Sequence, residues 1–203
     1  MMQPHLPFER RSESGEPQRN ILGVDGLHYF PGFVSQTESD LLMAGIDAAS
    51  WQSDISRRVQ QYGFRYSYER RVVDPFDVAP PIPGWADELR ERLVRLRIFE
   101  KLPDQIIVNE YLPGQGIAPH VDRAVFGEVV GSLSLLSPVV MDFAHREGEE
   151  RRSLVLEPLS LLVLERAARY HWTHGIAKRR SDSGTQRGRR ISLTLRTVKE
   201  PRA

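Results

Sequence analysis

GRRISLTLRTV, residues 188–198, is the last of four apolar segments that decide the fold of this chain. The other three are DQIIVNEYL at 104–112, SLSLLSPVVMDF at 132–143 and RRSLVLEPLSLLVLE at 151–165. Each has the length and the apolar residues of one or two β-strands, and Gly, Pro and Asp residues separate them. No helical pattern lies between them. The segments therefore predict an antiparallel β-sandwich or jelly roll.

Two helices are predicted ahead of this β region, which makes the chain an α+β protein. Ser35 and Glu38 form a capping-box pattern at the start of the first helix, which we expect to span residues 36–50. Its apolar stripe consists of Leu41, Leu42, Ile46 and Ala49. The second helix follows the proline cluster PPIP, and its apolar face consists of Trp85, Leu89, Leu93 and Leu96.

Length and composition are those of one globular domain. The chain has 203 residues, of which 40% are hydrophobic and 27% charged, enough to enclose a sizeable core. We expect a single domain at residues 21–203. Residues 1–20 are rich in Pro, Ser, Glu and Arg and have little to bury, so we expect them to form a disordered tail.

Charge and cysteine content exclude several classes of function. The formal charge is only +1, so the molecule as a whole does not attract nucleic acid or an anionic membrane, and any nucleic-acid surface must be local. The absence of cysteine excludes disulfides and thiolate metal sites, so a metal would need His and carboxylate ligands. No apolar run is long enough to span a membrane, and the N-terminus lacks a signal-like apolar core. A cytoplasmic protein with no membrane partner is expected.

A His-x-Asp pair, His120 and Asp122, follows the turn PGQG. On a strand, residues two apart face the same side, so the two side chains point to one place. His174 follows a strongly apolar strand and offers a third ligand. Two histidines and one carboxylate form the facial triad of non-haem Fe(II) oxygenases, although zinc could use the same ligands. His171 is expected to face the other way, partly buried beside Trp172.

The last strand has two chemically different faces. Its polar face consists of Arg190, Ser192, Thr194 and Arg196, and its apolar face of Ile191, Leu193 and Leu195. If the polar face points inward, its guanidinium groups need an acidic partner, because an unpaired buried charge is costly. A small dicarboxylate would satisfy both arginines. If this face points outward, the arginines belong to a solvent-exposed edge strand.

Three separated motifs resemble the signature of AlkB-type dioxygenases, which depend on 2-oxoglutarate and Fe(II). They are HVD at 120–122, HGI at 174–176 and RISLTLR at 190–196, in the family's order. The resemblance covers residues 21–198. It implies a double-stranded β-helix (jelly roll) core with N-terminal helices and a substrate-recognition lid. It also implies Fe(II) as cofactor, 2-oxoglutarate and O₂ as co-substrates, and no obligate protein partner.

The resemblance also assigns roles to individual residues. The iron ligands would be His120, Asp122 and His174. The co-substrate residues would be Asn109, Tyr111, Arg190, Ser192 and Arg196. Arg190 would form a salt bridge to the distal carboxylate of 2-oxoglutarate, Arg196 would lie near the iron-bound end, and Ser192 stands where some members carry asparagine. An amide and a phenol, like those of Asn109 and Tyr111, offer the donors that a carboxylate accepts.

The substrate predicted from the resemblance is a nucleic-acid base. RRVQQYG, GSLSLLSPVVMDF and RYHWTHGI look closest to the AlkB-like domain that hydroxylates a modified wobble uridine of tRNA within a larger protein. Family members that demethylate DNA bases can carry an acid two residues beyond the iron-binding aspartate, where this chain has Ala124. Hydroxylation or demethylation of modified RNA, tRNA or alkylated DNA is therefore expected. The same chemistry on a protein or small molecule, or a non-catalytic metal-binding barrel, remains the alternative.

A predicted lid, residues 56–74, interleaves aromatic and basic residues like a hairpin. Its candidate substrate-binding residues are Arg57, Arg58, Tyr62, Phe64 and Tyr66, and further arginines follow at Arg65, Arg70 and Arg71. Arginines would hold phosphate and an aromatic ring would stack on an extruded base. If the aromatics pack inward, the segment is an ordinary surface hairpin. A second basic stretch, residues 177–190, is expected to form a long mobile loop.

Overall fold

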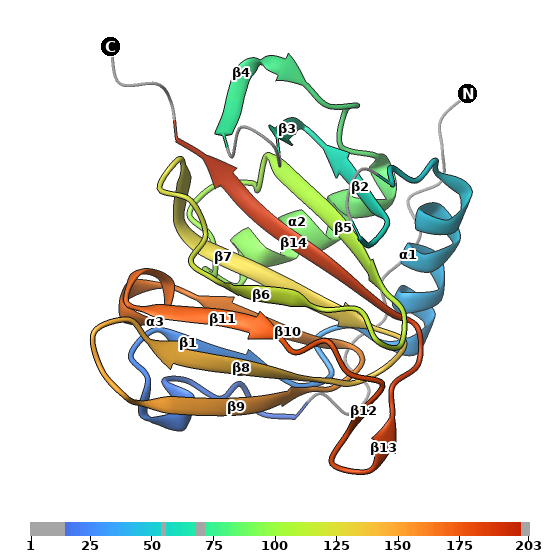
Figure 1. The fold of residues 1–203 in the computed structure, drawn as a ribbon. Helices are drawn as coiled ribbons and strands as arrows, with labels where there is room; N and C mark the ends of the chain where they lie inside the picture. Colours follow the sequence, from blue (N-terminus) through green and yellow to red (C-terminus); the bar gives the residue numbers. More distant parts are fainter. Residues whose placement is uncertain (1–14, 54–55, 68–71, 200–203) are drawn as a thin grey trace, which may run out of the picture.

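The computed structural model describes residues 15–53, 56–67 and 72–199 and places the predicted β region in two facing sheets (Figure 1). The larger sheet consists, in spatial order, of β1 (Leu27–Phe30), β10 (Ser160–Leu164), β7 (Phe126–Leu135), β14 (Arg190–Val198), β5 (Gln105–Tyr111) and β2 (Val59–Tyr62). The smaller sheet consists of β6 (Ile117–His120), β11 (Trp172–Ile176), β8 (Val139–His145) and β9 (Arg151–Leu156). All these pairings are antiparallel. The predicted jelly roll is confirmed.

Two helices cover the outer face of the larger sheet. They are α1 (Gln36–Ala48) and α2 (Asp87–Arg95), the latter entered through the 3₁₀ turn η2 (Gly84–Ala86). The predicted capping box starts α1, with Ser35 and Glu38 each hydrogen-bonding the other's backbone N–H. Buried apolar residues of α1, α2 and β14 belong to one cluster, which includes Ile46, Leu93 and Leu193. The helices are held in place because they bury the apolar face of β14.

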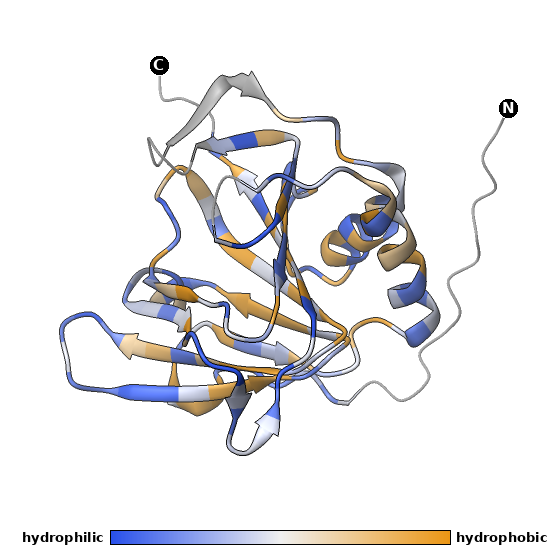
Figure 2. Ribbon diagram, turned by 45° about the vertical axis from the view of Figure 1, so that its right-hand side comes forward, coloured by the Kyte–Doolittle hydropathy of each residue, from blue (hydrophilic) through white to orange (hydrophobic). Residues whose placement is uncertain are grey.

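A second apolar cluster fills part of the space between the sheets. Leu162 and Leu164 of β10 meet Met141 and Phe143 of β8 there, with Trp172 of β11 beside them. Figure 2 shows hydrophobic and hydrophilic residues alternating along the strands, as expected where successive side chains point to opposite faces. The larger sheet therefore has apolar contacts on both faces, and the polar face of β14 points between the sheets.

Helix boundaries and faces differ slightly from the prediction. The first helix ends at Ala48, two residues earlier than expected. Leu41 is 43% exposed, whereas Met43 is 8% exposed and packs in the core. Leu96 lies beyond α2 and is 39% exposed. Each error is a shift of one position or one turn. The spacing of apolar residues in a sequence does not fix a helix end or its buried face more closely than this.

The basic stretch at 177–190 packs against the smaller sheet, so the prediction of a long unpacked loop is wrong. It contains the short strands β12 (Ser181–Asp182) and β13 (Thr185–Gln186), which pair with each other. Asp182 accepts hydrogen bonds from Arg179, from Arg187 and from the backbone N–H of Val140 in β8. Arg179 and Arg187 of this stretch are therefore both paired with the carboxylate of Asp182. The local positive charge is correspondingly smaller than the sequence indicates.

The chain enters the fold slightly before Ile21. Gln18 and Tyr29 exchange two backbone hydrogen bonds of 2.8 Å. A short 3₁₀ turn, η1 (Ile21–Gly23), then leads toward β1. The predicted disordered tail at residues 1–20 lies mostly outside the described residues, since the description begins at Gly15.

The predicted lid divides between two structures. Its first strand is β2, which forms the edge of the larger sheet beside β5. Only β3 (Phe64–Ser67) and β4 (Val72–Val78) form a separate hairpin, at the top of Figure 1. Arg70 and Arg71 lie outside the described residues. Gly63 joins the two parts with a φ of 80°, and a Cβ there would lie 1.9 Å from the carbonyl oxygen of Asp104.

Candidate active site

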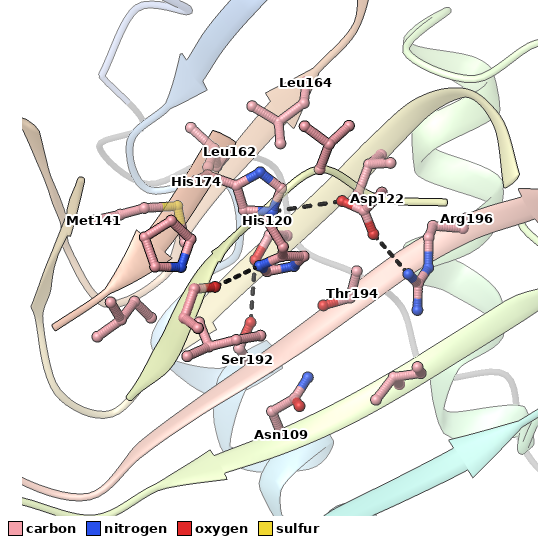
Figure 3. A pocket seen from close by; sticks show the side chains of 18 of the residues that line it. Asn109, His120, Asp122, Met141, Leu162, Leu164, His174, Ser192, Thr194 and Arg196 are labelled. Atoms are coloured by element: carbon pink, nitrogen blue, oxygen red, sulfur yellow. Dashed lines mark hydrogen bonds and ion pairs between the residues drawn. The ribbon is translucent and has the colours of Figure 1, made fainter. Parts of the chain in front are cut away.

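The polar face of β14 lines a cavity of about 470 Å³ between the two sheets (Figure 3). The cavity contains all the residues predicted for metal and co-substrate, namely Asn109, Tyr111, His120, Asp122, His174, Arg190, Ser192 and Arg196. Arg190 is 2% exposed and Arg196 is 6% exposed. The alternative in which the arginines lie on a solvent-facing edge strand is therefore wrong.

His120, Asp122 and His174 converge in this cavity. His120 ends β6 and lies opposite His174 of β11 in the strand register, with ring centroids 4.5 Å apart. One ligand atom from each of the three residues lies within 4.8 Å of the other two. Nε2 of His174 is 3.5 Å from Oδ2 of Asp122. Neighbouring ligands with bonds of about 2.1 Å to one ion are about 3 Å apart, so this set fits a single metal ion.

Both histidines offer a ring nitrogen that a metal ion can bind. Nδ1 of His120 lies 2.9 Å from the carbonyl oxygen of Ala118, which can only accept, so Nδ1 carries the proton and Nε2 keeps its lone pair. Burial lowers the pKa of His174 to about 4, despite the opposing effect of Asp122. His174 is therefore a neutral imidazole at neutral pH, the form that binds a metal ion.

Asp122 is kept anionic by a buried arginine. Burial alone would raise its pKa, but Arg196, followed by His174 and His120, lowers the pKa to about 2. Nη1 of Arg196 donates to Oδ1 of Asp122 over 2.7 Å. Nε of the same guanidinium donates to Gln105, and its Cζ lies 3.8 Å from the ring centroid of Phe126. The carboxylate is thus oriented from one side and presents its other oxygen to the histidines.

Arg169 was missed by the sequence analysis. It belongs to the short helix α3 (Arg166–Tyr170), is 1% exposed, and donates to the backbone carbonyls of Asp122 at 2.7 Å and Arg123 at 2.8 Å. These bonds fix the chain just after β6, where strand pairing has ended. A charged residue between alanines and an aromatic residue was the available signal, but its partners lie 46 and 47 positions away.

Arg190 is a buried cation in the cavity wall whose guanidinium has two unpaired nitrogens. Its Nη2 donates to Oγ of Ser134 over 2.8 Å, while its Nε and Nη1 have no hydrogen-bond partner in the described structure. Burial lowers its pKa to about 10, and Tyr111, 5.3 Å from ring centroid to Cζ, opposes that shift. A buried guanidinium with unpaired nitrogens fits a carboxylate ligand, because charge-assisted hydrogen bonds to a carboxylate would satisfy them.

The remaining co-substrate candidates lie across the same strands. Tyr111 pairs with Arg190 and Asn109 with Ser192 in the register of β5 and β14. Oδ1 of Asn109 accepts a 2.9 Å bond from Nε of Arg57, which leaves the amide N–H groups of Asn109 as donors. The Cζ of Arg57 also lies 5.4 Å from the Tyr111 ring centroid. Arg57 therefore belongs to this end of the cavity.

Only part of the predicted substrate-binding set lines the cavity. Arg57 and Tyr66 line it. Arg58 instead pairs with Glu110, Tyr62 is buried in the core with its ring 5.8 Å from that of Trp85, and Phe64 packs against the cluster of Phe126 and Val198. The sequence showed which residues were aromatic or basic, but the pairing of β2 with β5 decided the faces.

His171 has no place in this site. It lies exposed after α3, rather than partly buried beside Trp172 as predicted. His145 is the histidine that packs edge-on against Trp172, with ring centroids 5.3 Å apart.

A jelly roll whose inner cavity holds two histidines, an aspartate and buried arginines has the architecture of a non-haem iron oxygenase. The model of the 2OG-Fe(II) oxygenase superfamily matches residues 26–196, and the chain belongs to that superfamily. It is an AlkB-like dioxygenase that uses Fe(II), 2-oxoglutarate and O₂. The alternative of a non-catalytic barrel is not supported.

Two relatives are similar over most of this chain. The alkylated DNA repair protein ALKBH8 homolog of Arabidopsis thaliana is 32% identical, over 96% of this chain and 65% of its own length. The tRNA (carboxymethyluridine(34)-5-O)-methyltransferase ALKBH8 of Mus musculus is 36% identical, over 86% of this chain and 30% of its own length. This chain therefore spans less than two thirds of either relative.

A solved structure shares the fold. The structure of OsALKBH1 superposes with a TM-score of 0.64 and 17% identity, over 85% of this chain and 96% of that chain. Within the part of the chain that is described, no helix is long and apolar enough to cross a membrane.

Proposed function

We propose that this chain oxidises a nucleic-acid base, by hydroxylation or demethylation, at an Fe(II) ion held by His120, Asp122 and His174. The observation that carries the proposal is the convergence of these three side chains in the same buried cavity as the unsatisfied Arg190. A 2-oxoglutarate oxygenase must bind a metal ion and a dicarboxylate in one cavity, and these residues offer a site for each.

Each protein group has a defined task in this proposal. Fe(II) with 2-oxoglutarate and O₂ supplies the oxidising power that attacks a C–H bond. His120 and His174 offer neutral nitrogen ligands, and Asp122 offers an anionic oxygen oriented by Arg196. Arg190 binds the distal carboxylate through its free nitrogens. The side chains of Asp122 and Arg196 are 6% and 8% exposed, and this burial strengthens the interaction between their charges.

Asn109, Tyr111 and Ser192 complete the co-substrate end. Asn109 presents amide donors because Arg57 already occupies its carbonyl oxygen. Tyr111 carries a phenol on the same strand and lies between the guanidinium groups of Arg57 and Arg190. Ser192 shares a 3.1 Å hydrogen bond with Ser132, so its hydroxyl is oriented within the cavity wall.

The nucleic-acid substrate is inferred from the relatives and from two side chains. The names of the plant and mouse relatives refer to DNA repair and to a tRNA uridine. Arg57 and Tyr66 place a cation and an aromatic ring in the cavity wall, which suits a phosphate and a stacked base. The lid that would present them is the β3–β4 hairpin, with Arg57 contributed from just before β2.

Mass spectrometry of RNA, DNA and protein pools incubated with enzyme, Fe(II) and 2-oxoglutarate tests the proposal. We expect a mass change in nucleic acid, together with succinate formation, and neither with Asp122→Ala. A product found only in the protein pool would move the substrate to protein. Absence of both succinate formation and 2-oxoglutarate binding under reducing conditions would refute the enzymatic proposal.

We also infer a cytoplasmic location, on the sequence argument alone. Fractionation of cells expressing the tagged protein tests it, and recovery in an organelle would contradict it.

A further inference from the structure

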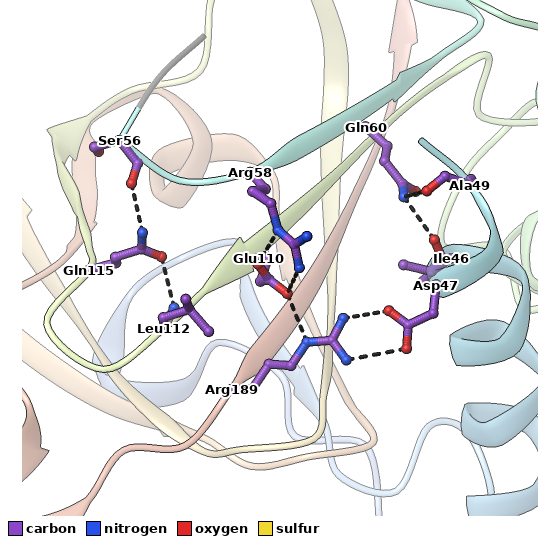
Figure 4. Close-up of polar contacts among 10 residues, drawn as sticks. All are labelled: Ile46, Asp47, Ala49, Ser56, Arg58, Gln60, Glu110, Leu112, Gln115 and Arg189. Carbon is purple, nitrogen blue, oxygen red and sulfur yellow. Dashed lines mark hydrogen bonds and ion pairs between the residues drawn. The ribbon is translucent and has the colours of Figure 1, made fainter. Parts of the chain in front are cut away.

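Four ionised side chains form a cluster behind the co-substrate end of the cavity (Figure 4). At its centre is Glu110, whose side chain is 2% exposed. Arg58 donates to it through two nitrogens at 2.6 and 2.7 Å, and Arg189 donates through Nε at 2.8 Å. Arg189 also pairs with Asp47 of α1, at 2.5 and 3.2 Å. The cluster thus links three chain segments and a helix.

Each member on those segments is the sequence neighbour of a cavity residue. Arg58 follows Arg57, and Arg189 precedes Arg190. Glu110 lies between Asn109 and Tyr111, which both line the cavity. Because successive residues of an extended chain point to opposite sides, the cavity residues face inward while their neighbours meet on the outer face.

The two inward arginines lie at strand ends, because Arg190 is the first paired residue of β14 and Arg57 precedes β2. β14 begins at Arg190 and β2 begins at Val59, so Arg189 and Arg57 lie just outside the strands. Strand ends have fewer backbone hydrogen bonds and open more easily than strand centres. The ion cluster joins both ends to Glu110 in the last part of β5, and α1 contributes Asp47 from the other side.

We propose that Glu110 is a positioning residue for 2-oxoglutarate, because its carboxylate holds the segments that carry Arg57 and Arg190 against β5. The inference rests on the proposed function of the cavity. Glu110 touches no cavity ligand itself and acts through its neighbours. Loss of its charge leaves two guanidinium groups sharing one neutral amide oxygen, so the two strand ends separate and Arg190 no longer meets the distal carboxylate at a fixed place.

The test is 2-oxoglutarate binding to Glu110→Gln, measured by equilibrium dialysis with labelled 2-oxoglutarate, Fe(II) present and O₂ excluded. We expect about tenfold weaker binding of 2-oxoglutarate, the smaller of the losses in affinity typical when a residue that supports a direct ligand is replaced. The KM for 2-oxoglutarate should rise by a similar factor, with kcat at saturation changed by less than about twofold, the pattern of lost binding rather than lost chemistry.

Glu38→Gln is the matched control. It also replaces a mostly buried, arginine-paired carboxylate on the helix side of the sheet, since Glu38 pairs with Arg92 between α1 and α2. We expect it to lower the melting temperature without changing the affinity for 2-oxoglutarate. If Glu110→Gln lowers the melting temperature and binds 2-oxoglutarate like the wild type, the role of Glu110 is structural and the proposal is overturned.

Two further results separate the possibilities. If Glu110→Gln does not fold, Arg58→Gln takes its place, because the Arg58 side chain is 48% exposed and its loss still removes one arm of the cluster. Weaker binding in that variant supports the proposal and unchanged binding overturns it. If the wild-type protein itself binds no 2-oxoglutarate, the proposed function has failed, which is a different result from unchanged binding in the variants.

Discussion

Replacing Arg190 by methionine should stabilise the ligand-free protein while it abolishes tight co-substrate binding. The pKa of Arg190 is lowered to about 10, mainly by burial, and this shift from the ordinary arginine value corresponds to roughly 3 kcal/mol against the charged form. Methionine keeps an unbranched apolar chain and removes that cost. It also removes the hydrogen bond to Ser134, worth about 1 kcal/mol, and the contact with the Tyr111 ring, worth about another 1 kcal/mol.

The net gain is therefore about 1 kcal/mol in the free energy of unfolding, or roughly 3 °C in melting temperature for a domain of this size. Binding should change in the opposite direction. Removing one partner of a buried ion pair costs about 3–5 kcal/mol, which weakens 2-oxoglutarate binding by at least about a hundredfold. At a concentration of 100 Kd, the wild type gains about 2.7 kcal/mol of stability from the ligand and the variant gains almost none.

Thermal unfolding with and without 2-oxoglutarate, with Fe(II) present and O₂ excluded, measures both effects. Arg190→Met should melt above the wild type without 2-oxoglutarate and below it with saturating 2-oxoglutarate. Arg187→Met is the control, because Arg187 is also buried but its guanidinium donates to Asp182 and to the carbonyl of Ala177, so its loss removes hydrogen bonds that stabilise the fold. If Arg190→Met lowers the ligand-free melting temperature as much as Arg187→Met, the reasoning about an unsatisfied buried cation is wrong.

Three further results are expected. Asp122→Ala should abolish succinate formation and, by leaving Arg196 buried without its carboxylate, lower stability by about 3 kcal/mol in urea unfolding; full activity in the folded variant would contradict the triad. Hydrogen bonding from Arg58, followed by that from a second arginine, lowers the pKa of Glu110 below its usual 4.5, so its carboxylate contributes stability above pH 4.5 that is lost as pH falls. The difference in melting temperature between wild type and Glu110→Gln should therefore shrink below that pH, and a constant difference would contradict the assignment. Gly63→Ala should destabilise the protein by more than about 2 kcal/mol, since its Cβ would meet a carbonyl oxygen, whereas Gly184→Ala, with a similar positive φ but open space, should cost less.

Local sequence patterns correctly predicted those features whose interactions lie within one helix or strand. The alternation of β14 predicted which face carries the arginines, because side-chain direction on a strand has a period of two. Ser35 and Glu38 predicted the start of α1, because the capping box is completed within four residues. The apolar segments predicted an antiparallel sandwich or jelly roll, and the resemblance to AlkB-type dioxygenases implied the jelly roll that the two antiparallel sheets confirm.

Contacts between distant segments could not be predicted in the same way. Arg57 and Arg58 are adjacent and chemically identical, yet one lines the cavity and the other pairs with Glu110 on the opposite face. Their choice of face depends on the register of β2 against β5, which involves residues about fifty positions apart. Arg169 likewise gained its role from carbonyls in another segment.

By itself, then, the amino-acid sequence determined the two-faced strands, the capped helix and the candidate metal ligands, since these depend on residue type and on spacing within an element. Only the tertiary structure decided which arginines stay unsatisfied and which find carboxylates. That distinction depends on burial and on partners from distant segments. It separates Arg190, which fits the co-substrate, from Arg187 and Arg189, whose charges are already paired.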